Sequence, residues 1–307
     1  MRKFLLFLGY LLSAFLLFMA CDFGLGAIFD RYLFLDNDPK MLYAHQGGGG
    51  EDLVVLGASR ASHHYCPSVF EDRLGFKCYN YGMDGRNIFN QYIVADEILS
   101  NSLKKPHIVI LEVASIDIMN SPNYNGEKLS NLYVLYKRNK SVRDIIDIEN
   151  PEKTFVLQNI SIYRYNSRLL GYLKRILAID SNNLNGYEPL YKQWGEDVER
   201  KDDTNVDFYP EKEYYLRRLI EYFLTSGVKL FVFNSPEYYV FENRIPWEDK
   251  VESICKEYNV PFINHAHDVL FLAHREWFNE PFHLNDMGAK AYSEIVVNDI
   301  NHYLQNK

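Results

Sequence analysis

Short apolar runs alternate with longer amphipathic segments along most of the chain. The runs at 52–57, 107–113, 228–233 and 261–264 are rich in Val, Ile, Leu and Phe, and have the length of buried parallel strands. Apolar residues at helical spacing occupy 88–103, 212–225, 247–258 and 286–304. This alternation predicts an α/β domain, a three-layer α/β/α sandwich around a central, mostly parallel sheet.

The N-terminal segment has a different pattern. Residues Phe4 to Cys21 carry no charge, and at 1.5 Å per residue they form a helix of roughly 27 Å, which nearly spans a bilayer core. Arg2 and Lys3 precede the run and Asp22 follows it. We therefore predict an uncleaved signal anchor with the N-terminus in the cytoplasm and the rest of the chain extracytoplasmic, in the periplasm or at the cell surface.

A lipoprotein signal is the alternative, because residues 18–21 loosely resemble a lipobox ending at Cys21. We expect residues 1–22 to form the anchor, 23–50 a stalk that ends in the flexible glycines 47–50, and 51–307 the folded domain. An insertion rich in Tyr and Asn, at about 120–210, interrupts that domain. Its aromatic residues could cover an active site or simply pack the insertion against the core.

Composition and charge argue against several classes of protein. The 307 residues are 47% hydrophobic and carry a formal charge of -8, which predicts a large core and argues against a broad nucleic-acid-binding surface. The cysteines form no CxxC pair, so neither a zinc site nor a dense disulfide scaffold is expected. A single Cys66–Cys78 disulfide stays open for an exported domain. No metal or organic cofactor is implied.

Candidate chemistry begins after the first predicted strand, with Gly57-Ala58-Ser59-Arg60. Ligands of open α/β sheets bind beyond the carboxyl ends of strands, and a serine at such a turn exposes its hydroxyl. Its own N–H can also stabilise a developing oxyanion. A helix cap or a phosphate-binding loop is an equally good interpretation of this motif alone. The P-loop pattern GxxxxGK[ST] is absent from the sequence.

Two further segments precede predicted helices. Residues 80–87 contain Gly82 and Gly85, whose backbone N–H groups could face a substrate, although an ordinary glycine turn has the same appearance. Residues 278–288 contain Glu280 and His283, spaced so that the carboxylate could orient the imidazole of a general base acting on Ser59. By itself His283 could be a structural loop histidine.

The order of these blocks resembles the SGNH, or GDSL-like, hydrolase superfamily, and the resemblance runs from residue 52 to the C-terminus. The GASRAS segment is most similar to the membrane-anchored branch that handles acyl groups on cell-surface polymers, such as polysaccharide O-acetyl transfer and teichoic acid D-alanylation proteins. By position, the resemblance implies Ser59 as nucleophile, His283 as general base and Glu280 as their carboxylate. Gly85 and Ser59 would supply oxyanion N–H groups.

The sequence departs from that family at Ala114-Ser115-Ile116-Asp117, which takes the place of the family's third block, GxND, so that Ile116 replaces the oxyanion asparagine. It also departs at Glu280, where the family has Asp. Losing one oxyanion donor costs about 10²–10³ in rate, so another group would have to replace it. Ser115 is the nearest substitute, and Asn87 or Asn234 could also reach the site. Asp117, when ionised, would repel an oxyanion.

Neighbouring residues could contact a substrate. Arg60 could bind a carboxylate or phosphate on a polymer, with an internal salt bridge as an equal alternative. Asn234 follows the third predicted strand and could shape the pocket for the acyl group or sugar. Asn87 is the last residue of the segment 80–87 that contains Gly82 and Gly85.

The resemblance implies a serine esterase or acyltransferase acting on esters, O-acetyl groups in particular, of a cell-surface or exported polysaccharide. Water or a sugar hydroxyl would resolve the acyl-enzyme. The second hypothesis, favoured by Ile116 and Glu280, is a catalytically weak or inactive accessory protein that binds a glycan or a membrane acyltransferase. A Ser59–His283 distance beyond about 5 Å, with no donor where the lost asparagine would have pointed, would favour it. A phosphate-binding protein that uses the GASR turn is a remote third option.

Overall fold

The computed structural model describes residues 1–32, 34, 38–102, 104–120, 127–165 and 184–305. The chain divides into two compact units, one made of Met1–Leu42 and Asn125–Asp180, the other of Tyr43–Tyr124 and Ser181–Lys307. Part of the predicted insertion, at 121–126 and 166–183, lies outside the described residues.

The second unit is built on a parallel sheet of five strands in the order β2-β1-β3-β5-β7. The strands are β1 (Leu53–Leu56), β2 (Cys78–Asn80), β3 (Ile108–Glu112), β5 (Lys229–Asn234) and β7 (Phe262–Asn264). The four apolar runs of the sequence are all strands of this sheet. The edge strand β2 was not predicted, because its three residues are too few to show a periodicity.

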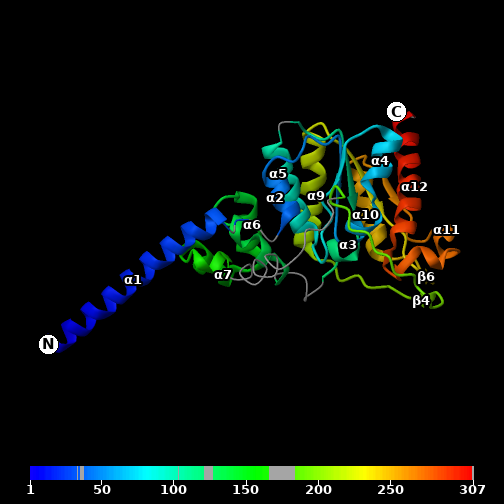
Figure 1. The fold of residues 1–307 in the computed structure, drawn as a ribbon. Helices are drawn as coiled ribbons and strands as arrows, with labels where there is room; N and C mark the ends of the chain where they lie inside the picture. The colour runs from blue at the N-terminus through cyan, green and yellow to red at the C-terminus, as the bar shows by residue number, and fades with distance from the viewer. Residues whose placement is uncertain (33, 35–37, 103, 121–126, 166–183, 306–307) are drawn as a thin grey trace. The chain divides into compact units, whose positions relative to one another are not determined.

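Helices cover both faces of the sheet (Figure 1). One layer contains α3 (Ser59–His64), α4 (Pro67–Leu74) and α12 (Asp286–Gln305), with α12 in contact with the other two. The other layer contains α5 (Ile88–Asn101), α9 (Pro210–Thr225) and α10 (Pro246–Glu257). In that layer α9 contacts α5, and Arg217 of α9 pairs with Glu257 at the end of α10. The predicted three-layer α/β/α fold is therefore confirmed.

Alternating strand residues build the core between the sheet and the first layer. Val55, Ile110 and Phe233 are fully buried, and they belong to one apolar cluster with Tyr292 and Val296 of α12. The other side chains of the strands are buried against the opposite helices, as expected for a sheet covered on both faces. This rigid core holds the carboxyl ends of β1, β3, β5 and β7 side by side.

The direction of strand addition reverses at β1. The chain runs from β1 to β2 on one side, and then crosses to β3 on the other side. Such a switch point opens a crevice at the carboxyl ends of the strands, where ligands of α/β proteins bind. Ser59 follows β1 at this point.

Short elements complete the second unit around this edge. A two-stranded pair joins β4 (Glu199–Lys201) to β6 (Tyr239–Phe241), and another joins β8 (Phe278–Glu280) to β9 (His283–Leu284). The remaining elements are the helical turns η1 (Ser115–Asp117), α11 (Val269–Leu272) and η4 (Arg275–Trp277).

The first unit contains the long helix α1 (Arg2–Tyr32), whose apolar window has a mean hydropathy of 2.4 and no buried residue, so α1 is long and apolar enough to span a membrane. Its C-terminal part is different. Asp22 is buried, and its carboxylate accepts the backbone N–H groups of Ser161 and Ile162 at 2.7 and 2.9 Å. The other helices of this unit are η2 (Glu127–Leu135), α6 (Lys140–Glu149), α7 (Pro151–Asn159) and η3 (Ile162–Tyr165).

Residues 23–50, expected to be a stalk that ends in flexible glycines, contain helical segments and a hydrogen-bonded turn. Helix α1 extends to Tyr32, and α2 (Pro39–His45) follows. The glycines then form a bonded turn, in which Gly47 N–H donates to Ala44 O and Gly48 N–H to Tyr43 O. Positive φ angles at Gly47 and Gly48 account for glycine at these positions.

Cys66 and Cys78 are buried free cysteines, so the disulfide left open by the sequence is not formed.

Candidate active site

Ser59, His283 and Glu280 form a continuous hydrogen-bonded chain. His283 Nε2 lies 2.7 Å from Ser59 Oγ, and His283 Nδ1 contacts Glu280 Oε1. The other oxygen of Glu280 accepts the Phe282 N–H at 3.0 Å. With Nδ1–H donating to Glu280, Nε2 is left as an acceptor for the serine proton, which is the arrangement of a nucleophile, a base and an orienting carboxylate.

The carboxylate is held in its charged form. Burial opposes its ionisation, but the hydrogen bonds from His283 and from the Phe282 N–H outweigh burial and keep the pKa of Glu280 below its ordinary value. Glu280 ends β8 and His283 begins β9, so one tight antiparallel turn carries both residues. The extra methylene of Glu relative to Asp therefore does not prevent contact with the imidazole.

The backbone around Ser59 explains the GxS pattern. Gly57 has φ +152, and a side chain there would meet Ala61 and Glu112. Only glycine allows β1 to turn this tightly into α3. Ser59 is the first residue of α3, and the N–H groups in the first turn of a helix have no intrahelical acceptor. Its N–H is thus suited to donate to an oxyanion.

Residues 80–87, which contain Gly82 and Gly85, form an ordered turn that packs against α3. A Cβ on Gly82 would lie 2.3 Å from Ser62 N, so the segment can approach α3 closely only with glycine there. Met83 N–H donates to Gly57 O at 3.2 Å, and Gly85 has φ +65. The half-buried Gly85 thus follows a turn bonded to the loop that carries Ser59. This agrees with its expected role as an oxyanion donor, which stays a prediction.

In the segment 114–117, Asp117 makes the side-chain hydrogen bonds that fix the turn. Asp117 Oδ2 accepts the Ala114 N–H and Oδ1 accepts the Gln91 side-chain N–H, both at 2.9 Å. Burial raises the pKa of Asp117 to about 7. Ser115 is exposed on η1, and no hydrogen bond among the described residues joins it to Ser59 or His283. The structure therefore does not bring Ser115 into the triad network.

Arg60 forms internal salt bridges, which was one of the two alternatives that the sequence left open. Its side chain is only 5% exposed, with Nε 3.1 Å from Glu112 Oε1 and Nη1 2.6 Å from Glu237 Oε1. Nη2 donates to Val113 O at 3.0 Å and to Asn234 Oδ1 at 2.7 Å. Arg60 therefore clamps the carboxyl ends of β3 and β5 beside the nucleophile.

Asn234 and Asn87, expected as substrate-binding residues, are both fully buried. Asn234 accepts from Arg60 and donates to Glu248 at 2.8 Å and to Asn264 at 3.1 Å. Asn87 caps α5, with its side-chain oxygen accepting the Phe89 N–H at 3.2 Å. These contacts give both residues a structural role, and their contact with a substrate stays a prediction.

A second buried chain supports the candidate base, and sequence reasoning did not find it. Leu284 N–H donates to His64 Nε2 at 2.9 Å, so Nδ1–H donates to Ser235 Oγ at 2.8 Å. That hydroxyl donates to Glu112 at 2.8 Å. Burial holds the pKa of His64 well below its usual range, which keeps the ring neutral and able to accept from Leu284. His64 thereby anchors β9 next to His283.

His63 of α3 contacts the segment 80–87 through Asp84. Its Nδ1 faces the Glu188 carbonyl at 2.5 Å and its Nε2 faces Asp84 at 3.1 Å. Burial disfavours the charged ring, but these two acceptors outweigh it and raise the pKa of His63. Only an imidazolium can donate from both nitrogens. Its ring meets that of His283 edge-on, with centroids 5.3 Å apart.

Nothing in the sequence pattern marks Glu112, Ser235 or His64 as partners, because each contact joins residues more than a hundred positions apart. The adjacent histidines 63 and 64 were the only visible signal. Among the described residues no group of His, Cys, Asp and Glu side chains is arranged to hold a metal ion.

Comparison with solved structures finds distant similarities. No family model and no curated protein matches the chain. A protein from Bacteroides fragilis, provisionally described as an acylhydrolase, aligns over 85% of this chain and 95% of its own, with 10% identity and a TM-score of 0.43. A GDSL-like lipase from Bacteroides thetaiotaomicron aligns over 87% and 99%, with 9% identity and a TM-score of 0.40.

A lipolytic protein from Desulfitobacterium hafniense, provisionally assigned to the G-D-S-L family, covers 80% of this chain and 98% of its own, at 10% identity and a TM-score of 0.40. At such identities and TM-scores, these likenesses carry no argument about this chain.

Proposed function

We propose that the chain is a serine esterase or acyltransferase of the SGNH type. It would act on ester groups, O-acetyl groups in particular, of a cell-surface or exported polysaccharide. The observation that carries the proposal is the Ser59–His283–Glu280 chain, with 2.7 Å between Ser59 Oγ and His283 Nε2. This distance is well inside the limit of about 5 Å beyond which an accessory role would be favoured.

In the proposed reaction, His283 Nε2 removes the Ser59 proton as Oγ attacks the acyl carbonyl. The Ser59 N–H and the Gly85 N–H stabilise the oxyanion, and Glu280 stabilises the imidazolium that forms. His283 then gives its proton to the departing alcohol oxygen. Water or a sugar hydroxyl, deprotonated by His283, then attacks the acyl carbon. The bond from that carbon to Ser59 Oγ breaks, His283 returns the proton to Oγ, and a carboxylic acid or a new ester is released.

A membrane-anchored, extracytoplasmic location is part of the proposal. The uncharged part of α1 is exposed along its whole length, and the helix continues without a break through Cys21 to the buried Asp22. We propose a signal anchor rather than a lipoprotein, because the leading position of the lipobox-like residues is Phe18. If so, intact-mass and peptide mass spectrometry of the membrane-extracted protein finds residues 1–20 still attached. A mature protein that begins at a lipidated Cys21 would instead identify a lipoprotein.

The test of activity is turnover of p-nitrophenyl acetate by the full chain in detergent, with Ser59→Ala and His283→Ala in parallel. We expect a rate above background for the wild type and a loss of at least about 10²-fold in each variant. Equal rates in all three proteins would refute the proposal and favour the accessory role that Ile116 suggests.

A further inference from the structure

A pocket of about 560 Å³ opens on the same edge of the sheet as Ser59. Its floor includes Asn264, the last residue of β7, which pairs in register with Asn234, the last residue of β5. Strand β6 and the start of α10 form its walls. The volume lies within the range of about 300–1,000 Å³ that is typical of small-molecule sites.

The pocket adjoins the turn that carries the candidate base. Tyr239 lines the pocket, and its ring packs against Phe282 with centroids 5.1 Å apart. Phe282 directly precedes His283 and donates its N–H to Glu280. Lys201 lies 4.4 Å from the centroid of the Tyr239 ring and 4.6 Å from that of Phe282, and so caps this aromatic pair. A group bound in the pocket is therefore on the His283 side of the triad.

That side is where the alcohol part of an ester belongs. The acyl carbon must be next to Ser59 Oγ, whereas the departing alcohol oxygen receives its proton from His283 Nε2. An acceptor hydroxyl in a transfer reaction occupies the same position, since His283 must remove its proton. The pocket is thus placed for the alcohol of the ester or for an acceptor, rather than for the acyl group.

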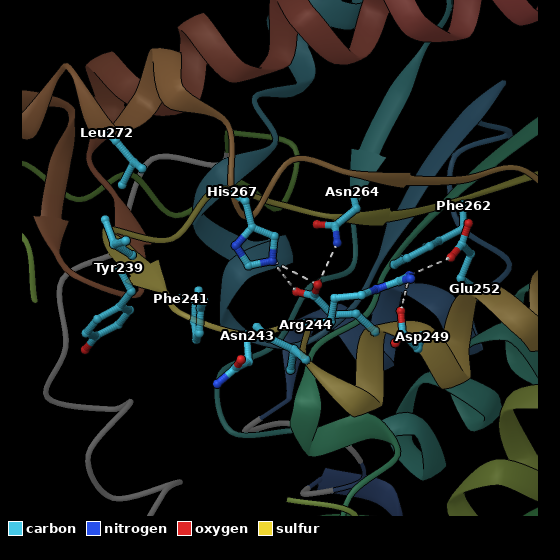
Figure 2. Close-up of a pocket in the computed structure, with 13 residues that line it drawn as sticks. Tyr239, Phe241, Asn243, Arg244, Asp249, Glu252, Phe262, Asn264, His267 and Leu272 are labelled. Carbon is cyan, nitrogen blue, oxygen red and sulfur yellow. Dashed lines mark hydrogen bonds and ion pairs between the residues drawn. The ribbon is translucent and has the colours of Figure 1, made fainter. Parts of the chain in front are cut away.

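The lining has apolar rings on one side and charged pairs on the other (Figure 2). Tyr239, Phe241 and Leu272 form the apolar side, with the imidazole of His267 5.0 Å from the Phe241 ring centroid. On the opposite side, Arg244 bonds to Asp249 at 2.5 Å. Aromatic faces pack against the C–H groups of a sugar ring, and polar side chains on the other side can bond its hydroxyls.

The charge of the lining selects among sugars. Glu248 is buried and fixed by Asn234 and Asn264, each at 2.8 Å, and by His267 at 2.9 Å. The hydrogen bond that His267 donates to Glu248 raises the pKa of His267 against the effect of burial. Both cations among the lining residues are already paired with carboxylates, Arg244 with Asp249 and Glu252, and His267 with Glu248. A uronate or phosphorylated sugar would have to compete with these carboxylates for the two cations, and its binding is therefore disfavoured.

We propose that this pocket binds an uncharged sugar residue of the acylated polymer and places its ester or hydroxyl oxygen at His283. The inference rests on the proposed esterase or acyltransferase function and specifies the alcohol side of its substrate.

The test separates binding from chemistry by using the full chain with Ser59→Ala in detergent. Calorimetric titration with three tetrasaccharides compares cellotetraose, chitotetraose and a tetramer of galacturonate. We expect millimolar or tighter binding of at least one uncharged tetramer, and at least tenfold weaker binding of the uronate. Adding Phe241→Ala should weaken the binding of the uncharged sugar at least tenfold. The matched control Tyr214→Ala, which removes an exposed aromatic ring from α9, should not change it.

Three results would overturn the inference: no binding of either uncharged tetramer at 10 mM, uronate binding of equal strength, or no effect of Phe241→Ala. Turnover of p-nitrophenyl acetate by the wild type is measured separately. Sugar binding that depends on Phe241 without any Ser59-dependent turnover would retain the pocket and reject the enzyme. Ser59-dependent turnover without sugar binding would reject the pocket alone.

Discussion

His283 Nε2 lies 2.7 Å from Ser59 Oγ, although 224 positions separate the two residues in the chain. The contact exists because the turn after β1 and the β8–β9 turn meet at the carboxyl edge of one parallel sheet. Glu280 and His64 fix the histidine from two directions, through its own Nδ1 and through the backbone N–H of Leu284. The candidate base is therefore positioned before any substrate binds.

Glu280 should matter through both its charge and its length. We expect Glu280→Gln to lower kcat for p-nitrophenyl acetate by roughly 10²–10⁴-fold, because a neutral amide cannot stabilise the imidazolium. Glu280→Asp should retain more activity than Glu280→Gln. Steady-state kinetics of the two variants provides the measurement. Equal activity of Glu280→Gln and the wild type would remove the carboxylate from the mechanism.

The oxyanion role proposed for Gly85 can be distinguished from a general effect of backbone strain by comparison with Gly75. Both have left-handed backbone angles, φ +65 and +68, but Gly75 caps α4. Alanine at either position should cost about 1 kcal/mol of folding free energy. Only Gly85→Ala should also lower kcat, by up to about 10²–10³-fold, because it displaces an oxyanion donor. Parallel losses of kcat in both variants would argue against an oxyanion role for Gly85.

The His63–Asp84 ion pair should stabilise the fold at low pH. The pKa of His63 is raised on folding, so its contribution is fully present below the unfolded value of about 6.5 and disappears as the pH rises through the folded value. Asp84 is 61% exposed, which limits the effect to about 1 kcal/mol or less. Thermal unfolding of the wild type and Asp84→Asn should differ at pH 5.5 and converge at pH 8.5. A difference that grows with pH would contradict this assignment.

Breaking the buried ion pair beside the site should have a much larger effect on stability. Glu112 is 1% exposed, and Glu112→Gln would leave the buried Arg60 with Glu237 as its remaining carboxylate partner. We expect a loss of about 3–5 kcal/mol in denaturant unfolding. The surface pair Arg200–Glu242 supplies the control, since Glu242→Gln should change stability by less than about 1 kcal/mol. Equal losses of unfolding free energy in the two variants would show that the buried ion pair contributes no more to stability than the surface pair.

The parts of this structure that sequence predicts are those with a local signal. The strands β1, β3, β5 and β7 and the helices α5, α9, α10 and α12 follow from periodicity, and the meeting of Ser59 with His283 follows from motif order. The polar network does not, because Arg60, Glu112 and Asn234 look like surface residues until the sheet brings their partners together. For the same reason the sequence leaves substrate binding and an internal salt bridge equally open for Arg60, and the structure shows the salt bridge. The sequence predicts flexible glycines at 47–50 because it does not reveal the carbonyl acceptors of Gly47 and Gly48.

The most direct test of the central claim is covalent labelling of Ser59. The full chain in detergent is incubated with a fluorophosphonate, and the adduct is located by peptide mass spectrometry. We expect one phosphonylated residue, Ser59, in the wild type, and no adduct at this position in Ser59→Ala or His283→Ala, because Oγ reacts only when His283 removes its proton. An unlabelled Ser59 in the wild type, or equal labelling in His283→Ala, would contradict the account.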